Sequence, residues 1–127
     1  MHALIIDDSR SMRMILARIL KEAGFEHTEA GHGQEALDHL NAGLRPDICL
    51  IDWNMPVMNG YEFVTEVRRN REWRDITLMM VTTESEHSNI VAALAAGAHE
   101  YVIKPFTADA IREKLELLGL TQNGALA

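Results

Sequence analysis

Four short runs of apolar residues recur along the chain, and segments of helix length separate them. Unbroken apolar runs of this kind are typical of parallel strands that are buried on both faces of a sheet. The runs lie at residues 3–6, 48–51, 78–81 and 101–103. Residues 27–30 form a more polar run, which predicts a fifth strand at an edge of the sheet.

Between these runs, apolar residues recur every three or four positions, which predicts amphipathic helices. Gly24 and Gly97 are placed to end the first and fourth helices, and Thr107 can cap the last helix, with Asp109 in its first turn. Trp73 is expected to pack near the end of the third helix. The apolar positions of the five predicted helices are, in chain order, Met12, Ile15, Leu16, Ile19 and Leu20; Ala36, Leu37 and Leu40; Phe63, Val64 and Val67; Ile90, Val91, Leu94 and Ala95; and Ile111, Leu115 and Leu118.

Five strands that alternate with five helices predict one doubly wound α/β domain with a parallel sheet and right-handed crossovers. A chain of 127 residues is about the size of one domain. We assign residues 1–120 to this domain and expect residues 121–127, which are mostly small, to form a short flexible tail.

The net charge of −7 argues against binding to nucleic acid or to an anionic membrane, because both need a basic surface. No apolar stretch approaches the ~20 residues that span a bilayer, and the N-terminus lacks the features of a signal peptide. A cytoplasmic protein is therefore expected. The single cysteine, Cys49, lies inside an apolar run, so it excludes an intrachain disulfide and is interpreted as a buried thiol.

Polar residues with a common chemistry follow the predicted strands. Asp7 and Asp8 come after the first strand and Asp52 after the third, and ligands of such sheets bind beyond the carboxyl ends of the strands. Three carboxylates in one cleft repel each other unless a cation neutralises them. Oxygen ligands with room for water favour Mg²⁺. The alternative is that Asp7, Asp8 or Ser9 merely caps the following helix.

Two further strand ends carry groups that suit a phosphate. Lys104 can place a positive charge on a phosphate oxygen, and Pro105 after it makes a rigid turn that is a candidate for a cis peptide bond. Thr82 or Thr83 can donate a hydroxyl, although threonines at a strand end also simply suit a strand.

Together these motifs resemble the receiver domain of two-component response regulators, in particular the stand-alone chemotaxis regulators. The resemblance covers residues 3 to about 118. It implies a flavodoxin-like (βα)5 fold with the strand order 2-1-3-4-5, of which this family is itself a standard example. The residues that carry it are Asp7-Asp8-Ser9, Asp52-Trp53-Asn54-Met55-Pro56 with Gly60, Val81-Thr82, and Tyr101-Val102-Ile103-Lys104-Pro105-Phe106.

The resemblance also implies a role for each site residue. Asp52 matches the phosphoacceptor, which takes a phosphoryl group from a phosphohistidine of a sensor histidine kinase. Asp7 and Asp8 match the Mg²⁺-binding acids, and the backbone carbonyl of Asn54 matches a further contact to the metal. With Mg²⁺, Lys104 would neutralise the phosphoryl oxygens.

Other matching positions imply a switch and a lifetime for the signal. Thr82 matches the switch hydroxyl and Tyr101 the aromatic residue that turns inward, although an aromatic residue in a strand often only packs. The target protein would dock on the face made by helix four, strand five and helix five. Asn54 and Glu84 match positions that tune dephosphorylation, with or without a phosphatase, and predict a short-lived phosphorylated state. A monomer is expected.

The pathway and some rival functions remain open at this level. Residues 84–88 are acidic, whereas chemotaxis regulators that bind the flagellar switch tend to carry basic residues there, so motor binding is left open. The alternative to chemotaxis is an intermediate of a phosphorelay or a single-domain regulator of another pathway. A docking module that is never phosphorylated is disfavoured by the complete acidic set.

Three further classes of site fit the residues less well. A Mg²⁺-dependent phosphohydrolase usually has a second acid two residues after its nucleophile, where this chain has Asn54. A flavin carrier needs a phosphate at its first loop, which Asp7 and Asp8 would repel. The six histidines lack the spacing of a transition-metal site.

Overall fold

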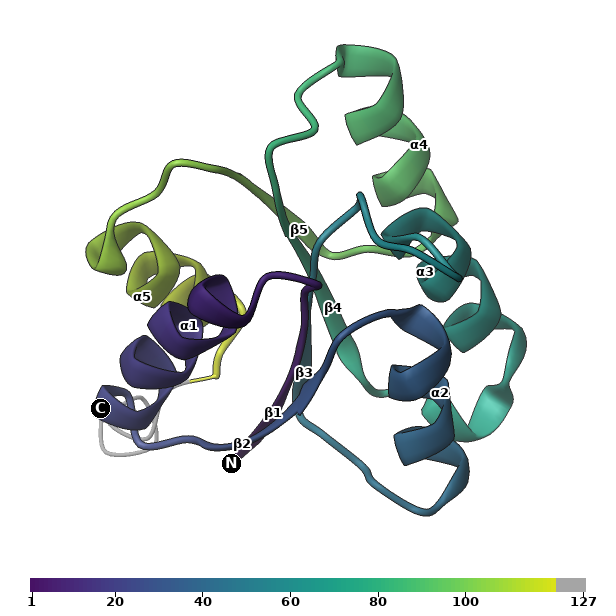
Figure 1. Cartoon of the computed structure of the whole chain (residues 1–127), viewed down its shortest axis with the longest axis horizontal. Coiled ribbons are helices and arrows are strands. Elements are labelled where there is room, and N and C mark those ends of the chain that lie inside the picture. The colour runs from purple at the N-terminus through teal and green to yellow at the C-terminus, as the bar shows by residue number, and fades with distance from the viewer. Residues whose placement is uncertain (121–127) are drawn as a thin grey trace.

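The computed structural model describes residues 1–120, and the predicted tail at residues 121–127 lies outside the described residues (Figure 1). Strands and helices alternate along the chain, with one short 3₁₀ helix before the fourth strand. The elements are β1 (His2–Ile6), α1 (Arg10–Glu22), β2 (Glu26–Ala30), α2 (Gly33–Asn41), β3 (Ile48–Ile51), α3 (Gly60–Arg69), η1 (Arg71–Trp73), β4 (Thr77–Thr82), α4 (His87–Ala96), β5 (Glu100–Ile103) and α5 (Ala108–Leu117).

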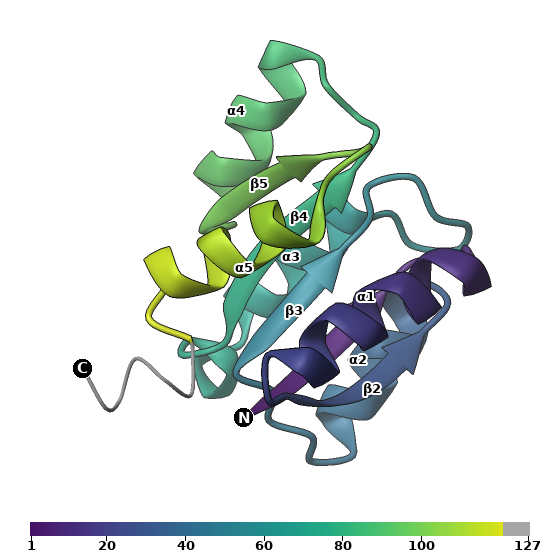
Figure 2. The same ribbon diagram turned by 90° about the vertical axis from the view of Figure 1, so that its left-hand side faces the viewer.

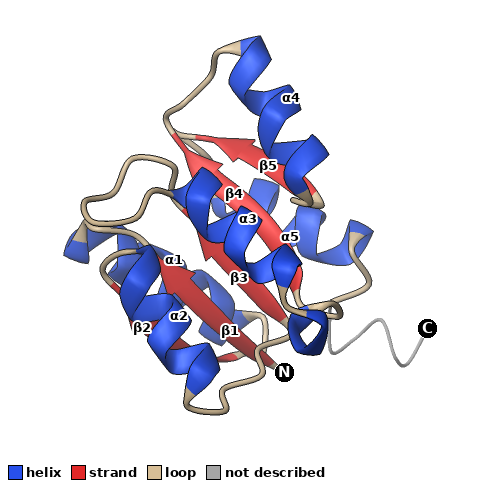
Figure 3. Cartoon of the chain, turned by 90° about the vertical axis from the view of Figure 1, so that its right-hand side faces the viewer, coloured by secondary structure: helices blue, strands red, loops and turns tan. Residues whose placement is uncertain are grey.

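The five strands form one parallel sheet in the order β2-β1-β3-β4-β5. Helices cover both faces of this sheet: α1 and α5 lie on one face (Figure 2), and α2, α3 and α4 on the other (Figure 3). The predicted flavodoxin-like α/β fold is confirmed, as is the place of the polar strand β2 at an edge. No helix within residues 1–120 is long and apolar enough to cross a membrane.

The sheet separates two apolar cores, which explains why its strands are apolar without interruption. Leu4 and Ile6 of β1 face the core under α2, α3 and α4, whereas Ala3 and Ile5 face the core under α1 and α5. Successive residues of a strand point to opposite faces, so both sets of side chains must be apolar. Cys49 is buried in the first core, and burial raises the pKa of its thiol, as expected for a packing residue.

Four apolar positions of the predicted helices, Ala95 of α4 among them, are more exposed than an inward-facing stripe would be. Val91 and Leu94 of α4 are 49% and 43% exposed, and Ile15 of α1 is 49% exposed. Helix α4 lies beside the edge strand β5, where little of the sheet is left to cover, and Ala93 supplies its buried contact. The apolar spacing thus located α4 correctly but did not identify its buried face.

Local hydrogen bonds at the helix ends resolve one alternative. The hydroxyl of Ser9 accepts the N–H of Met12 at 3.2 Å, so Ser9 is the cap of α1, and neither aspartate before it has that role. The hydroxyl of Thr107 accepts the N–H of Ala110 and caps α5, as predicted. Because Ser9 provides the cap, the carboxylates of Asp7 and Asp8 are left for other interactions.

Candidate functional site

The carboxyl ends of β1, β3 and β4 place three polar side chains at one edge of the sheet. Asp7, Asp52 and Thr82 are the buried polar or charged residues among residues 1–120. Asp7 directly follows β1, and Asp52 directly follows β3. Backbone hydrogen bonds continue the ladder through both acids, from the N–H of Asp7 to Ala30 and from the N–H of Asp52 to Ile6. The acids are therefore held by the sheet itself.

Three carboxylates converge at this edge, and two of them lie close to one ammonium group. Oxygen atoms of Asp7, Asp8 and Asp52 all lie within 4.8 Å of one another. The Nζ atom of Lys104 donates to Oδ2 of Asp7 at 2.8 Å and approaches Oδ2 of Asp52 at 3.4 Å. One lysine does not balance three carboxylates, and like charges so close together are unfavourable without a further cation.

The remaining oxygen of Asp52 supports a ligand site. Its Oδ1 atom is buried and has no hydrogen-bond partner among residues 1–120. A buried carboxylate oxygen is normally paired, and an unpaired one signals a missing partner. Three acidic oxygens and no nitrogen or sulfur ligand form a donor set that suits a hard divalent cation. The residues present therefore fit a Mg²⁺ ion held by Asp7, Asp8 and Asp52.

Arg13 holds the backbone of Asp7 in place. Sequence reasoning missed this role of Arg13. Its Nη1 atom donates to the backbone carbonyl of Asp7 at 2.7 Å, while its Nε atom pairs with Glu29 at 3.0 Å. The N–H of Ser9 also donates to Oδ1 of Asp7 at 2.9 Å. Arg13 lies one turn into α1, so its spacing from Asp7 was the available signal, but an arginine on a helix is usually just exposed.

The loop from β3 to α3 contains two backbone constraints next to Asp52. A Cβ atom at Gly60 would lie 2.3 Å from the carbonyl oxygen of Asp52, so only glycine fits there. Val57 has a φ of 68°, which is unfavourable for a β-branched residue. Asn54 is exposed in this loop, two residues beyond Asp52. The peptide bond between Lys104 and Pro105, on the neighbouring side of the site, is cis.

Thr82 connects the site to the start of α4. It is fully buried, whereas Thr83 is exposed, so Thr82 is the threonine that belongs to the site. Its hydroxyl oxygen accepts the N–H of Glu84 at 3.2 Å, and its carbonyl accepts the N–H of Lys104 at 2.8 Å. A movement of Thr82 would therefore disturb hydrogen bonds both in the β4–α4 loop and at the end of β5.

Glu84 and Tyr101 meet at the same loop. The carboxylate of Glu84 accepts hydrogen bonds from the N–H of Glu86 and the amide of Asn89, both at 3.1 Å. The phenol hydroxyl of Tyr101 donates to the carbonyl oxygen of Glu84 at 2.6 Å. Burial, with the nearby negative charges of Glu84 and Asp52, raises the pKa of Tyr101 to about 12, so its hydroxyl stays protonated as a donor.

Comparisons with known proteins agree with this geometry. A family model described as "Response regulator receiver domain" matches residues 3–116. The chain is 40% identical over 119 residues to chemotaxis protein CheY1 of Helicobacter pylori, covering 93% of this chain and 96% of that protein. It is 39% identical over 125 residues to chemotaxis protein CheY of Pseudomonas aeruginosa, covering 98% of this chain and 100% of that protein.

A solved structure gives the same result for the fold. The crystallised chemotaxis response regulator CheY4 of Vibrio cholerae superimposes with a TM-score of 0.84 at 34% sequence identity. The match covers 92% of this chain and 97% of that chain. The family match to residues 3–116 includes all the strand ends that form the site.

Proposed function

The chain belongs to the family of response regulator receiver domains, and from that premise we propose that it is a phosphorylation switch whose phosphoacceptor is Asp52. Receiver domains of this type are signalling proteins, which accept a phosphoryl group from histidine kinases and bind target proteins. The observation that carries our proposal is the state of Asp52. It is a buried carboxylate with one unpartnered oxygen, and its other oxygen lies 3.4 Å from the ammonium of Lys104.

The proposed reaction is a transfer between two nucleophiles. A carboxylate oxygen of Asp52 forms a bond to phosphorus as the phosphorus–nitrogen bond of the donor phosphohistidine breaks, and the electron pair stays on the imidazole. Lys104 places a positive charge where the phosphoryl oxygens arrive. Attack by water later returns the Asp52 carboxylate and releases inorganic phosphate. The protein thereby catalyses its own phosphorylation and dephosphorylation and turns over no separate substrate.

We assign the metal site to Asp7, Asp8 and Asp52, with the backbone carbonyl of Asn54 as a further ligand. When bound, Mg²⁺ would supply positive charge that offsets the carboxylates and the phosphoryl oxygens. Asp7 is the most constrained of these ligands, since Ser9 and Lys104 contact its carboxylate and Arg13 holds its carbonyl. Asp8 is exposed and able to adapt its position to the ion.

The output of the switch is proposed to pass through Thr82 and Tyr101 to the face formed by α4, β5 and α5. The hydroxyl of Thr82 would turn from the N–H of Glu84 to a phosphoryl oxygen, which releases one bond of the β4–α4 loop. Because Tyr101 is bonded to the same loop, its side chain would move with it. A target protein that prefers the moved loop would then bind more tightly.

Chemotaxis is the pathway that we favour. The relatives at about 40% identity are chemotaxis proteins of the CheY type. A phosphorelay intermediate is the alternative, because the site chemistry is the same in both. The two proposals differ in whether phosphate moves on to a histidine of a second protein, so incubation of the phosphorylated chain with such a protein separates them.

The direct test of the function is phosphorylation by acetyl phosphate in the presence of Mg²⁺. We expect the wild type to gain one phosphoryl group by intact mass, and Asp52→Asn to gain none. Asp75→Asn is the matched control, because it changes an exposed aspartate in the turn before β4. Equal labelling of the wild type and Asp52→Asn would overturn the proposal. Steady release of phosphate without the labelled intermediate would favour a phosphohydrolase.

The lifetime of the phosphorylated state provides a second test. We propose that Asn54 and Glu84 flank the path of the attacking water and give a short lifetime. Glu84→Gln keeps an oxygen that can accept the bonds from Glu86 and Asn89, so the loop is preserved while the charge is removed. A decay rate that is the same in the wild type and in this variant would contradict the assignment of Glu84.

A further inference from the structure

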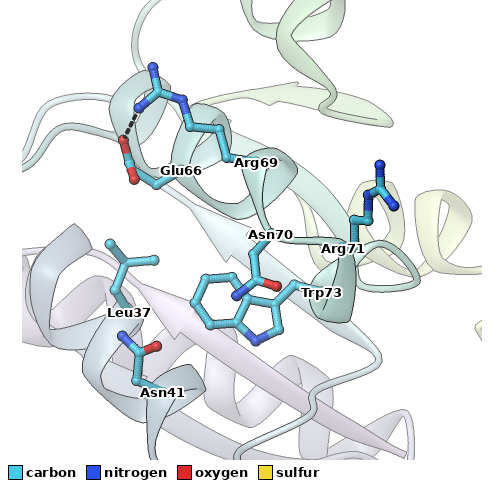
Figure 4. A pocket seen from close by; sticks show the side chains of 7 residues that line it. All are labelled: Leu37, Asn41, Glu66, Arg69, Asn70, Arg71 and Trp73. Carbon is cyan, nitrogen blue, oxygen red and sulfur yellow. Dashed lines mark hydrogen bonds and ion pairs between the residues drawn. The ribbon is translucent and has the colours of Figure 1, made fainter.

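A hollow lies between α2 and the end of α3 (Figure 4). Its volume is about 460 Å³, within the range of small-molecule sites. Figure 4 shows residues of α3 and η1 on one side and residues of α2 on the other. The lining residues are Leu37, Asn41, Glu66, Arg69, Asn70, Arg71 and Trp73.

The lining of this hollow is rich in hydrogen-bond donors. The side chain of Arg71 is exposed, and its guanidinium has no ion-pair or hydrogen-bond partner among residues 1–120. Arg69 pairs with Glu66 at 2.9 Å, which engages the single acid of the lining. The side-chain oxygen of Asn70 already accepts the N–H of Glu72, so this residue has mainly its amide N–H groups left. The unpaired groups of these three residues are therefore positively charged or hydrogen-bond donors.

Trp73 adds an unsatisfied donor to the same wall. Its side chain is only 5% exposed, and its indole N–H is buried without a hydrogen-bond partner among the described residues. A buried donor left unpaired is unfavourable, so an acceptor that reached this N–H would be favourable. Leu37 lies across the hollow and supplies an apolar surface opposite the indole (Figure 4).

We propose that this hollow binds a small organic phosphate of nucleotide size. Arg71 and Arg69 would pair with the phosphate, since guanidinium groups match its oxygens. The organic part would lie between Leu37 and Trp73, and the amides of Asn41 and Asn70 suit the mixed donors and acceptors of a base edge. The side chain of Arg71 points outward in Figure 4, so in the proposed complex it would turn toward the hollow to meet the phosphate.

The two tryptophans of the chain allow a direct test by NMR. A ¹⁵N-labelled sample gives one indole N–H signal for Trp73 and one for Trp53, which stacks on Tyr61 beside the other site. The Trp73→Phe variant assigns them. Titration with adenosine 5′-monophosphate is expected to shift the Trp73 signal in a saturable way and to leave the Trp53 signal in place. A titration that shifts neither signal, or both equally, would overturn the proposal.

Two arginine variants test the charge, and a second probe tests the organic part. We expect Arg71→Gln to weaken binding roughly tenfold through loss of one charge-assisted hydrogen bond. Arg74→Gln is the matched control: it removes an exposed arginine three residues away that does not line the hollow. Equal weakening by both variants would show only general attraction and would overturn the site. Binding of inorganic phosphate as tight as that of the nucleotide would exclude a role for the organic part.

Discussion

The hydroxyl of Tyr101 donates a 2.6 Å hydrogen bond to the carbonyl oxygen of Glu84 and so ties β5 to the loop before α4. This bond joins β5, which ends just before Lys104, to the β4–α4 loop. In that loop the N–H of Glu84 donates to the hydroxyl of Thr82. Glu84 thus connects the two residues: its N–H bonds the hydroxyl of Thr82, which would sense phosphate, and its carbonyl bonds Tyr101, which would respond. Movement of the loop cannot leave Tyr101 unaffected.

Tyr101→Phe is expected to lower the free energy of unfolding by about 1 kcal/mol, because it removes this hydrogen bond and leaves the carbonyl of Glu84 unpaired. Urea unfolding followed by circular dichroism measures the change. Tyr61→Phe is a matched control, since the hydroxyl of Tyr61 makes no hydrogen bond among residues 1–120. Equal stability of wild type and Tyr101→Phe would mean that the bond is not maintained in solution.

Removal of Mg²⁺ should destabilise the wild type but not the acid-site variants. At tenfold excess over its dissociation constant, the ion would add about 1.4 kcal/mol to the free energy of unfolding. Asp52→Asn removes one of the three clustered carboxylates, so we expect it to be more stable than the wild type in EDTA and to gain little from Mg²⁺. Urea midpoints with and without the ion measure both effects. A similar gain in the two proteins would argue that the ion binds elsewhere.

Acid should weaken the fold through His99. The Nδ1 atom of its ring accepts the N–H of Leu78 at 3.1 Å and lies 3.4 Å from Arg68. Burial and the charge of Arg68 lower the pKa of His99 below its usual 6.5. The unfolded chain therefore binds this proton at a higher pH than the folded chain does, and stability falls as the pH drops below about 6.5.

The variant His99→Asn should flatten this part of the pH dependence. The measurement is the urea midpoint between neutral pH and the mildly acidic range, compared with the wild type. His87→Asn serves as the control, because the side chain of His87 is exposed at the start of α4 and makes no hydrogen bond or ion pair among residues 1–120. If His99→Asn retained the full wild-type slope, the pH dependence would belong to other groups.

Val57→Asn should stabilise the protein by about 1 kcal/mol, because a left-handed backbone is unfavourable for valine and tolerated by asparagine. The side chain is 77% exposed, so little packing is lost. Val57→Ala keeps a Cβ atom and should gain much less. Thermal or urea unfolding of the three proteins gives the order. A loss of stability in Val57→Asn would show that the valine side chain contributes packing in this loop.

The strands and the acid site were predictable from the sequence for the same physical reason. A strand buried on both faces, such as β3, has no polar position, so the first polar residue after it marks the end of the strand and the edge of the sheet. Asp52 is both that marker and the site residue. One position of the sequence therefore indicates both where β3 ends and where the acid site lies.

Other features depended on packing and were not accessible from spacing. Val91 and Leu94 fit a helix period but lie on the outer side of α4, because the sheet ends beside it. Arg68 looks like an ordinary surface arginine in the sequence. In the structure, its guanidinium donates to the carbonyl groups of Gly97 and Ile76, at 3.1 and 2.9 Å, so it joins segments that are far apart in the chain.

Strand β5 leaves no room for a change in length. Tyr101 faces the core under α4, Val102 faces the other core, and Lys104 reaches the carboxylates directly after the strand. One inserted residue would turn every following side chain to the opposite face. Fusions of reporters or added peptides therefore belong at the turn after α2, where Gly43 has open space around it. A variant with an insert at Gly43 should retain the acceptor chemistry, whereas one with an insert in β5 would lose it.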